Sequence, residues 1–449
     1  MNAKNENRVP RHATKTSPWC WIPTLYIAEG LPYFAVNVLT VIMYVRMGIG
    51  VAEMAFFTGW LYLPWVIKPF WSPFVDLIKT KHHWTIAMEW LIGGAMAAVA
   101  LLLHLPFFFT ATLGVFWLMA FFSATHDIAA DGFYMLALTP HDQAAYVGVR
   151  STFYRIASII GQGGLVVLAG ILEERGGDVT TAWSVVFGVL STFFLIVAAW
   201  HTYILPRPTD DHPSGGKTAG DIMRGFGETF VSFFSKPHIW SALSFMLLYR
   251  LPEALCVKLV QPFLVGSRES GGLGLTTAEV GIVNGTVGVI ALLAGGIAGG
   301  IAISRNGLKR WLWPMAMTLT LPCLFYCLMA MTQPTDFIYI CTAVGLEQFG
   351  YGFGFTAFML YLIYFSQGES QTSHYAFCTA FMALGMMLPG MAAGWLHNEL
   401  ESIHIFGGEG PQGYVNFFWV AVATSVATFI SCALLKIDPR FGKKNQDKQ

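Results

Sequence analysis

Residues 182–205 read AWSVVFGVLSTFFLIVAAWHTYIL, a run without a single Asp, Glu, Lys or Arg. A helix that crosses the hydrocarbon core of a bilayer needs about twenty predominantly apolar residues. Similar stretches recur along the chain, and the sequence therefore predicts twelve membrane-spanning helices. The expected spans are 20–46, 54–76, 84–105, 110–136, 145–172, 182–205, 238–266, 276–302, 311–331, 336–366, 375–398 and 415–435.

The composition of the whole chain indicates a membrane protein. Of its 449 residues, 55% are hydrophobic and 12% are charged, whereas a soluble domain carries about 25% charged residues. A soluble protein with so few charges could not cover its surface with polar groups. Lys plus Arg and Asp plus Glu are balanced at 26 each, which argues against a nucleic-acid partner.

The seven cysteines give no indication of a metal or cofactor site. No C-x-x-C occurs, and all of them lie in or beside apolar stretches. Cys323 and Cys327 are one helical turn apart, a spacing that a metal site can use, but small apolar packing residues are the favoured interpretation. Residues 215–218 (GGKT) lack the upstream glycine of a phosphate-binding loop. We therefore expect no metal, no cofactor and no ATP-driven pumping.

The basic residues of the connecting segments predict the orientation. With the N-terminus inside, eighteen Lys and Arg residues fall on the cytoplasmic side, and at most three, Arg46, Arg175 and Arg268, fall outside. Because cytoplasmic loops carry an excess of Lys and Arg, both termini are expected in the cytoplasm. Residues 1–18 lack a small-residue cleavage site, so the first apolar stretch is interpreted as an uncleaved span.

The longest connection divides the chain into two halves of six spans. It contains an amphipathic stretch, DIMRGFGETFVSFFSK. The expected segments are a cytoplasmic tail at 1–18, a first half at 19–205, a cytoplasmic linker at 206–237, a second half at 238–435 and a cytoplasmic tail at 436–449.

A weak repeat relates the two halves. A basic turn follows span two just after Asp76, and another follows span eight at Arg305, six helices later. This period is the parallel repeat of major facilitator transporters. The second turn resembles the G-x-x-x-D-R-x-G-R-R loop of that superfamily, with Ser304 in the place of Asp.

Ionisable side chains occur inside the predicted spans, where each costs about 2.5–3.5 kcal/mol to insert. Such residues are kept for internal pairing or for function, although residues near a helix end can snorkel to the interface. Lys68, Glu89 and Arg150 are candidates for snorkelling. The full set is Glu29, Lys68, Glu89, Asp127, Asp131, Arg150, Arg155, Arg250, Glu253, Lys258 and Glu347.

Span four holds the densest cluster, residues 123–132 (SATHDIAADG). Asp127 and Asp131 are four residues apart, so they share one face of a helix. Two neighbouring buried carboxylates should not both stay ionised, which favours a role in proton coupling for at least one. The alternative is a salt bridge to Arg150 or Arg155 that joins spans four and five. His126 faces another side of the helix. It is either a hydrogen-bond donor to the cargo or an interior histidine whose hydrogen bonds are made within the protein.

Spans one and seven, which correspond between the halves, each place an acid beside an expected helix break. Glu29 precedes Pro32 in span one, and Glu253 follows Pro252 in span seven, where Arg250 can pair with Glu253 at i,i+3. Matching interrupted helices are typical of a central transport site. Further candidates for cargo contact are Tyr33, Trp60, Trp65, Tyr249, Lys258, Gln261, Glu347 and Gln348.

The span-four segment resembles the S-A-[ST]-Q-D-I-x-x-D-[AG] signature of bacterial muropeptide permeases of the AmpG type. Residues 30–33 (GLPY) look like the G-L-P segment of that family, and residues 65–76 (WVIKPFWSPFVD) resemble its K-x-x-W-x-P-x-x-D pattern. Further segments are similar between 249 and 300, and more loosely around 389–395. His126 stands where the family has Gln, and Arg250 where it has Lys, and these departures favour a cargo with a different saccharide.

The resemblance implies an all-α membrane protein with the major facilitator fold, which imports anhydro-sugar cell-wall fragments across the bacterial inner membrane with protons. The related acetyl-CoA transporter group shares this architecture. Another oligosaccharide, an acyl-CoA-like cofactor or a drug is therefore the alternative cargo. A membrane enzyme is a third class, but two acids on one turn of one helix are poorly placed to flank a bond. We predict a monomeric transporter whose partners are its cargo, protons and membrane lipids.

The candidate residues fall into three predicted roles. Proton coupling is assigned to Glu29, Asp127, Asp131 and Glu253. Cargo binding is assigned to Tyr33, Trp60, Trp65, Lys68, His126, Tyr249, Arg250, Lys258, Gln261, Glu347 and Gln348. Gating is assigned to Asp76, Arg150, Arg155 and Arg305.

Overall fold

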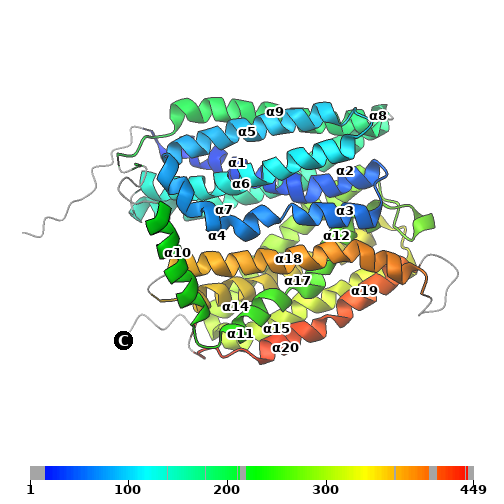
Figure 1. The fold of residues 1–449 in the computed structure, drawn as a ribbon. Coiled ribbons are helices and arrows are strands. Elements are labelled where there is room, and N and C mark those ends of the chain that lie inside the picture. Colours follow the sequence, from blue (N-terminus) through cyan, green and yellow to red (C-terminus); the bar gives the residue numbers. More distant parts are fainter. Residues whose placement is uncertain are drawn as a thin grey trace, which may run out of the picture.

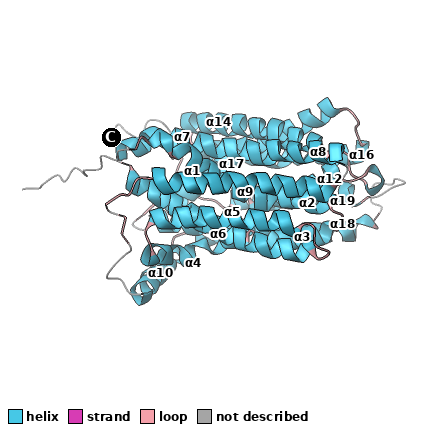
Figure 2. Ribbon diagram, turned by 90° about the horizontal axis from the view of Figure 1, so that it is seen from above, coloured by secondary structure: helices cyan, strands magenta, loops and turns pink. Residues whose placement is uncertain are grey.

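The computed structural model describes residues 16–138, 140–176, 178–209, 211–212, 219–368, 371–403, 412–439 and 441–442. Every regular element in these ranges is a helix, and most of the helices run roughly parallel through one bundle (Figure 1, Figure 2). Most of both predicted tails lies outside the described residues.

The helices of the first half follow the predicted spans. Span one contains η1 (Pro18–Cys20), α1 (Ile22–Phe34), η2 (Ala35–Leu39) and α2 (Thr40–Arg46), and span two contains α3 (Val51–Trp60) and α4 (Leu63–Ile78). Spans three and four are α5 (Lys81–Leu102) and α6 (Phe108–Ala137). Span five contains α7 (Pro140–Ile159), η3 (Ile160–Gly164) and α8 (Leu165–Gly176), and span six is α9 (Val179–Ile204).

The linker and the second half continue this order. The linker forms α10 (Ala219–Phe234), and span seven contains α11 (Ile239–Leu248) and α12 (Leu251–Val265), followed by η4 (Arg268–Ser270). Span eight contains α13 (Thr277–Val280), η5 (Gly281–Gly288) and α14 (Val289–Asn306), and span nine contains α15 (Leu308–Thr320), η6 (Leu321–Cys323) and α16 (Leu324–Thr332). Spans ten and eleven are α17 (Phe337–Ser366) and α18 (Gln371–Glu401), and span twelve contains α19 (Gly413–Ala423) and α20 (Ser425–Ala433).

In the described residues, ten helices are long and apolar enough to cross a membrane. The other two predicted spans are each built from two shorter helices, α3 with α4 and α11 with α12. Pro64 and Pro252 lie in the first turn of the second helix of each pair. Because proline has no N–H to donate to the preceding turn, it favours the start of a new helix. The prolines account for the difference between ten continuous helices and twelve predicted spans.

The expected break beside Glu29 in span one is not present. Helix α1 continues through Pro32, and the chain then widens into the π-helical turn η2. Similar wide turns occur at η3 and η5, and π-helical turns are frequent at functional sites. In span seven the helix does break, at Tyr249 and Arg250. The two corresponding spans are both irregular, but in different ways.

The apolar core is shared between the halves at one end of the bundle and divided at the other. The shared core runs from Val41 in α2 to Val283 in η5 and Phe417 in α19. Toward the other end, one core contains only first-half residues such as Phe133, and another contains only residues from Phe233 onward. We call the first end the closed end. The other, which carries α10, is the linker end (Figure 1).

Glycines let the two halves approach each other at the closed end. A Cβ atom on Gly285 in η5 would clash with the backbone of Gly163 in η3. In a second contact between the halves, Gly394 in α18 lies against Ala52 in α3. Small residues allow helix backbones to pack closely in membranes, so the closed end depends on these positions.

The linker is attached to both halves. Phe226 of α10 packs on Phe70 of α4, with ring centroids 5.0 Å apart, and on Phe377 of α18, at 5.5 Å. Before α10, the carboxylate of Asp211 accepts a hydrogen bond from the backbone N–H of Lys81 at the start of α5, at 2.8 Å. The amphipathic stretch of the sequence is therefore a helix that crosses the linker end (Figure 1).

Candidate transport site

The acid pair of α6 is neutralised by two different cations. Lys68 of α4 forms an ion pair with Asp127, and Nη2 of Arg150 in α7 lies 2.6 Å from Oδ1 of Asp131. The four side chains are between 24% and 37% exposed. A bridge to Arg150 or Arg155 was the sequence-based alternative to a coupling role. The structure contains that bridge for Asp131 and a different one for Asp127.

Glu29 joins these charges from α1. Its side chain is buried, and Oε2 has no hydrogen-bond partner in the described part of the chain. The charges of Asp131, Arg150 and Lys68 act on it. Arg150 is also held over the ring of Tyr26, 4.6 Å from its centroid, a favourable cation–π arrangement. The first-half cluster consists of Glu29, Lys68, Asp127, Asp131 and Arg150.

A further ion pair lies at the start of α12, between Arg250, the residue before the helix, and Glu253 in its first turn. Nε and Nη2 of Arg250 donate to the two carboxylate oxygens of Glu253 at 2.7 and 3.0 Å, as their i,i+3 spacing predicts. Arg250 also donates to the hydroxyl of Tyr351 in α17 at 2.9 Å and lies 4.7 Å from the ring centroid of Phe355. Its side chain is 10% exposed and that of Glu253 is 11% exposed, so this pair is more enclosed than the first-half cluster.

Lys258 of α12 is a buried cation at the junction of the two halves. It is 1% exposed, and Nζ donates to the carbonyl and hydroxyl oxygens of Thr58 in α3 at 3.3 and 3.2 Å. The ring of Tyr62 lies 5.1 Å from Nζ. Within the described ranges no carboxylate forms an ion pair with it. Since a buried ammonium with only neutral partners is unfavourable, Lys258 is well suited to bind an anion.

Aromatic rings gather beside this lysine. The ring centroid of Tyr33 lies 5.3 Å from that of Trp65 and 6.5 Å from that of Tyr62. Trp60 packs in the same small apolar cluster, which contains residues of both halves. Tyr62 is the ring that contacts Lys258, and it connects the lysine to Tyr33, which in turn packs on Trp65.

One other cargo candidate lies apart from this group. Tyr249 is fully buried in the core of the second half, where it stacks on Phe358 and donates to the carbonyl oxygen of Gly354 at 3.0 Å. Gln261 of α12 has a buried Oε1 without a hydrogen-bond partner in the described residues. The structure does not bring Tyr249 to Lys258.

The gating candidates are scattered. Arg150 belongs to the first-half cluster, and Arg155 of α7 acts electrostatically on Tyr351 of the second half. Arg305 is exposed at the end of α14. The backbone of Asp76 belongs to α4, but its side chain lies outside the described part of the structure.

His126 belongs to a separate buried network. Its Nε2 lies 3.2 Å from Oε1 of Glu89 in α5, and Nδ1 of His201 in α9 lies 2.7 Å from the same oxygen. Thr24 of α1 extends the network, with its hydroxyl 2.8 Å from Nε2 of His201. All three ionisable residues are at most 1% exposed, so Glu89 does not snorkel. Its partners come from two other helices, α6 and α9, and no spacing in the sequence indicates them.

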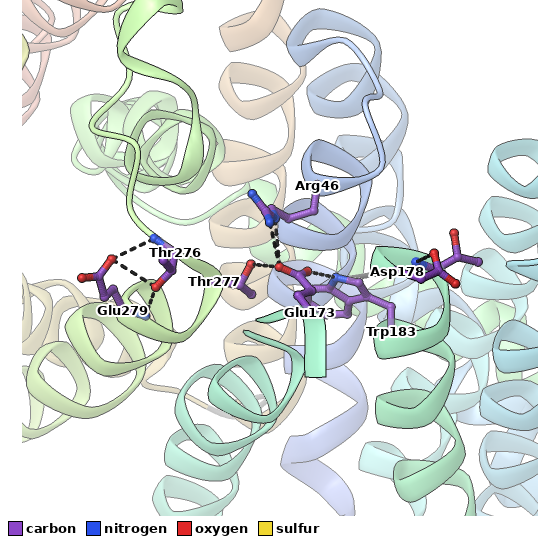
Figure 3. A network of polar contacts seen from close by, with 8 residues as sticks. Arg46, Glu173, Asp178, Trp183, Thr276, Thr277 and Glu279 are labelled. Atoms are coloured by element: carbon purple, nitrogen blue, oxygen red, sulfur yellow. Dashed lines mark hydrogen bonds and ion pairs between the residues drawn. The ribbon is translucent and has the colours of Figure 1, made fainter. Parts of the chain in front are cut away.

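Glu173 joins the two halves at the closed end (Figure 3). Its carboxylate accepts hydrogen bonds from Nη2 of Arg46 at 2.8 Å and from Nε1 of Trp183 at 2.9 Å, both in the first half. It also accepts one from the hydroxyl of Thr277 in α13, at 2.6 Å, which connects it to the second half. The sequence analysis missed Glu173. The only indication in the sequence was that Arg46 and Glu173 lie at the ends of spans one and five on the same side of the membrane.

Two helix caps flank this contact (Figure 3). The hydroxyl and N–H of Thr181, together with the N–H of Thr180, hold the pKa of Asp178 below its usual range at the start of α9. At the start of α13, Thr276 and Glu279 form a capping box, in which each side chain accepts from the backbone N–H of the other. The capping box fixes the first turn of α13, and with it the position of Thr277.

Glu347 of α17 has only neutral hydrogen-bond partners. Its side chain is buried, and Oε2 accepts hydrogen bonds from the hydroxyl of Tyr326 in α16 at 2.9 Å and from Nε2 of Gln348 at 2.8 Å. No basic side chain in the described residues forms an ion pair with it. Glu347 and Gln348, both predicted to contact cargo, are thus bonded to each other.

No family model matches the chain. The anhydromuropeptide permease of Escherichia coli (strain K12) is 26% identical over 372 residues, which cover 82% of this chain and 69% of the permease. The putative transporter AmpG 4 of Rickettsia conorii is 24% identical over 389 residues, which cover 84% of this chain and 89% of that protein. The resemblance to AmpG-type permeases is confirmed. Because these relatives carry the names of permeases and transporters, the prediction of a transporter rather than an enzyme is confirmed as well.

Solved structures share the fold. A bacterial homologue of the human lysosomal transporter Spinster, in an inward-facing and unoccupied conformation, aligns with a TM-score of 0.65 and 16% identity over 92% of this chain and 94% of its own. A D-xylose–proton symporter aligns with a TM-score of 0.67 and 10% identity over 91% and 96%. The all-α major facilitator fold is confirmed, and the chain is a multi-pass membrane protein. The count of twelve spans stays a prediction.

Proposed function

We propose that this protein is a proton-coupled importer of anhydro-muropeptides, or of related amino-sugar saccharides, across the bacterial inner membrane. The observation that carries the proposal is the environment of Lys258, a buried cation whose only partners in the described residues are Thr58 and the ring of Tyr62, which packs on Tyr33. The cargo class is supported by the name of a relative, an anhydromuropeptide permease.

The chemistry of such a cargo matches these residues. Ligand sites combine apolar and aromatic walls with a few placed polar groups, and sugar rings have apolar C–H faces that can pack on such walls. The lactyl and peptide groups of a muropeptide carry carboxylates, which need cations. Lys258 would supply one charge. Arg250, now bonded to Glu253, would supply another if the cargo carboxylate took the place of Glu253, since a guanidinium binds a carboxylate through two N–H groups.

The linker end is proposed to face the cytoplasm. The excess of eighteen basic residues over three supports this orientation. Asp127 lies ten residues from the end of α6, which is about 15 Å along the helix axis, and yet its side chain is 24% exposed. Together with the divided apolar core, this exposure supports a conformation that is open to the cytoplasm and closed toward the periplasm.

Cysteine labelling tests the orientation. In a Cys20→Ser background, which removes an exposed thiol, His212→Cys in the linker should react with an impermeant reagent only after the cytoplasmic side is exposed. Glu269→Cys, at the exposed turn η4 of the closed end, is the matched control and should react in intact cells. Labelling of His212→Cys in intact cells would overturn the orientation.

The proposed driving ion is the proton. The sequence-based candidates for coupling are Glu29, Asp127, Asp131 and Glu253, all inside membrane helices. Three of them have a basic partner in this conformation. A proton bound to any of these three would therefore have to replace a cation, and it would release that cation for cargo or for a movement of the helix.

Purified protein in proteoliposomes tests the proposed function. Under an inward-directed proton gradient, disaccharide anhydro-muropeptide should accumulate, and a protonophore should abolish the accumulation. Arg250→Gln should weaken uptake of the peptide-bearing, anionic form more than uptake of a neutral disaccharide. Arg224→Gln on the exposed surface of α10 is the control. Uptake of neutral sugars alone, unaffected by Arg250→Gln, would favour a general saccharide importer.

A further inference from the structure

The acids of the candidate site differ in what neutralises them. The ion pairs within the described residues are Asp127 with Lys68, Asp131 with Arg150, Glu253 with Arg250, Glu173 with Arg46, Glu89 with His126 and His201, and, on the exposed surface of α10, Glu228 with Arg224. Glu29 and Glu347 belong to no such pair. The charges of Lys68 and Arg150 still act on Glu29, whereas no basic group in the described ranges acts on Glu347.

The groups around Glu347 carry no positive charge. α16 supplies the hydroxyl of Tyr326, η6 supplies the thiol of Cys323, and α12 supplies the thiol of Cys256 and the carboxylate of Glu253. The other elements packed against α17 are α11, α14, α15, α18 and η5. In the described part of the chain, none of these presents a charged or titratable group to Glu347.

This environment suits a carboxylic acid better than a carboxylate. A buried carboxylate without a counter-charge is strongly unfavourable, and Glu253, a charge of the same sign, adds repulsion. Tyr326 and Gln348 both donate to Oε2. Oε1 accepts no hydrogen bond in the described residues and is the natural position for a proton.

Helix α17 holds Glu347 in a rigid element. The glycines at 350, 352 and 354 of this helix lie against neighbouring helices. A Cβ atom on Gly350 would clash with the carbonyl oxygen of Thr318 in α15, and one on Gly352 with that of Leu292 in α14. The helix is continuous over these positions. The glycines therefore allow close packing, and α17 is packed to move together with α14 and α15.

We propose that Glu347, rather than the acid pair of α6, takes up and releases the proton that drives transport. The proposal rests on the proposed function, since it names the residue that couples protons to the cargo. On release, the O–H bond of Glu347 breaks, the proton passes to water, and the electron pair stays on the carboxylate. The new negative charge then repels Glu253, whose charge acts on Glu347, and Glu253 holds Arg250, one of the two proposed cargo cations. Proton release would in this way alter the site that holds the anionic cargo.

Transport assays test the proposal first. Glu347→Gln keeps the size of the side chain but cannot exchange a proton. In proteoliposomes, it should exchange internal for external cargo, while losing the ability to concentrate cargo under a proton gradient. Glu228→Gln, on the exposed surface of α10, is the matched control and should concentrate cargo like the unmodified protein. A Glu347→Gln variant that concentrates cargo normally overturns the proposal.

Infrared difference spectroscopy tests the proton site without any cargo. The unmodified protein in lipid should show the carbonyl stretch of a protonated carboxylic acid at neutral pH, and this band should disappear in Glu347→Gln but persist in Asp127→Asn. Tyr326→Phe, which removes one donor and keeps the stacking of this ring on Phe418, should shift the band if Glu347→Gln does not fold. A band that neither variant alters overturns the proposal. If the band is lost in Glu347→Gln but the unmodified protein does not accumulate muropeptide, the proton site at Glu347 stands and the proposed cargo is rejected.

Discussion

The first-half cluster and the pair of Lys258 and Glu347 differ in whether their ionisable side chains have partners of opposite charge. In the cluster, the acid pair of α6 is matched by Lys68 and Arg150 from neighbouring helices. At the junction and in the second half, Lys258 and Glu347 are buried with neutral partners alone. Charges that are satisfied within the protein hold helices together, whereas charges without a counter-charge are available to a cargo and a proton. The comparison therefore separates the positioning charges from those that carry transport.

The largest effect is expected for Lys258. Lys258→Met removes the charge and keeps an apolar stem, so the affinity for an anionic cargo should fall by about 2–5 kcal/mol, which is roughly thirty-fold or more in Kd. Lys258→Arg should retain part of the affinity. Binding to purified protein, compared between anionic anhydro-muropeptide and a neutral disaccharide, measures the effect. Equal losses for both ligands would contradict an anion-binding role.

Variants of Asp127 test whether the acid pair of α6 positions helices or carries the proton. From the sequence, Asp127→Asn or Asp131→Asn is expected to abolish uphill accumulation. The structure gives Asp127→Asn a second consequence, because it leaves Lys68 without its partner, at about 1–3 kcal/mol for this partly exposed pair. If the pair only positions helices, the double variant Lys68→Met/Asp127→Asn should recover accumulation that the single variant loses. A double variant as inactive as the single one would assign the proton to Asp127.

A smaller effect is expected where the halves touch. Gly285→Ala should push η5 away from η3 and destabilise the protein by about 1–3 kcal/mol, seen as a lower melting temperature in detergent. Gly164→Ala is the matched control, because a Cβ atom there meets nothing within 4 Å. An unchanged melting temperature in Gly285→Ala would show that the halves are not held together at this contact.

The smallest effect is expected at the closed end. Thr277→Val removes the hydrogen bond to Glu173, which keeps Arg46 and Trp183 as partners. A loss of about 1 kcal/mol should raise the open fraction about fivefold, measured as faster labelling of Val283→Cys, a buried position at the closed end. Thr342→Val, whose hydroxyl bonds only within its own helix, should leave the labelling rate unchanged. Equal labelling rates in both variants would show that the hydrogen bond to Glu173 does not hold the closed end together.

Sequence reasoning succeeded where the interaction is local. The apolar runs predicted the helices, and the i,i+3 spacing of Arg250 and Glu253 predicted an ion pair on one helix. The amphipathic stretch of the linker became α10, with Phe226 packed on both halves. The helices and the ion pair follow from spacing along one segment of the chain, whereas the packing of Phe226 on both halves does not.

It failed where partners come from different helices. The pairing of Lys68 with Asp127 and the network of Glu89 with His201 depend on how helices cross, which spacing along the chain does not encode. The predicted break in span one was also wrong. Helix α1 continues through Pro32, because its packing against neighbouring helices tolerates the proline. Glu347 was found by its sequence position, but its neutral surroundings required Tyr326 from another helix.

Proton movement driven by cargo tests the central claim most directly. When anionic anhydro-muropeptide is added to lightly buffered proteoliposomes, protons that enter with the cargo should make the external medium more alkaline. The account predicts this signal for the unmodified protein and for Glu228→Gln, and its loss in Glu347→Gln even though that variant still exchanges cargo. Cargo uptake without proton movement in the unmodified protein, or an undiminished proton signal in Glu347→Gln, would contradict the account.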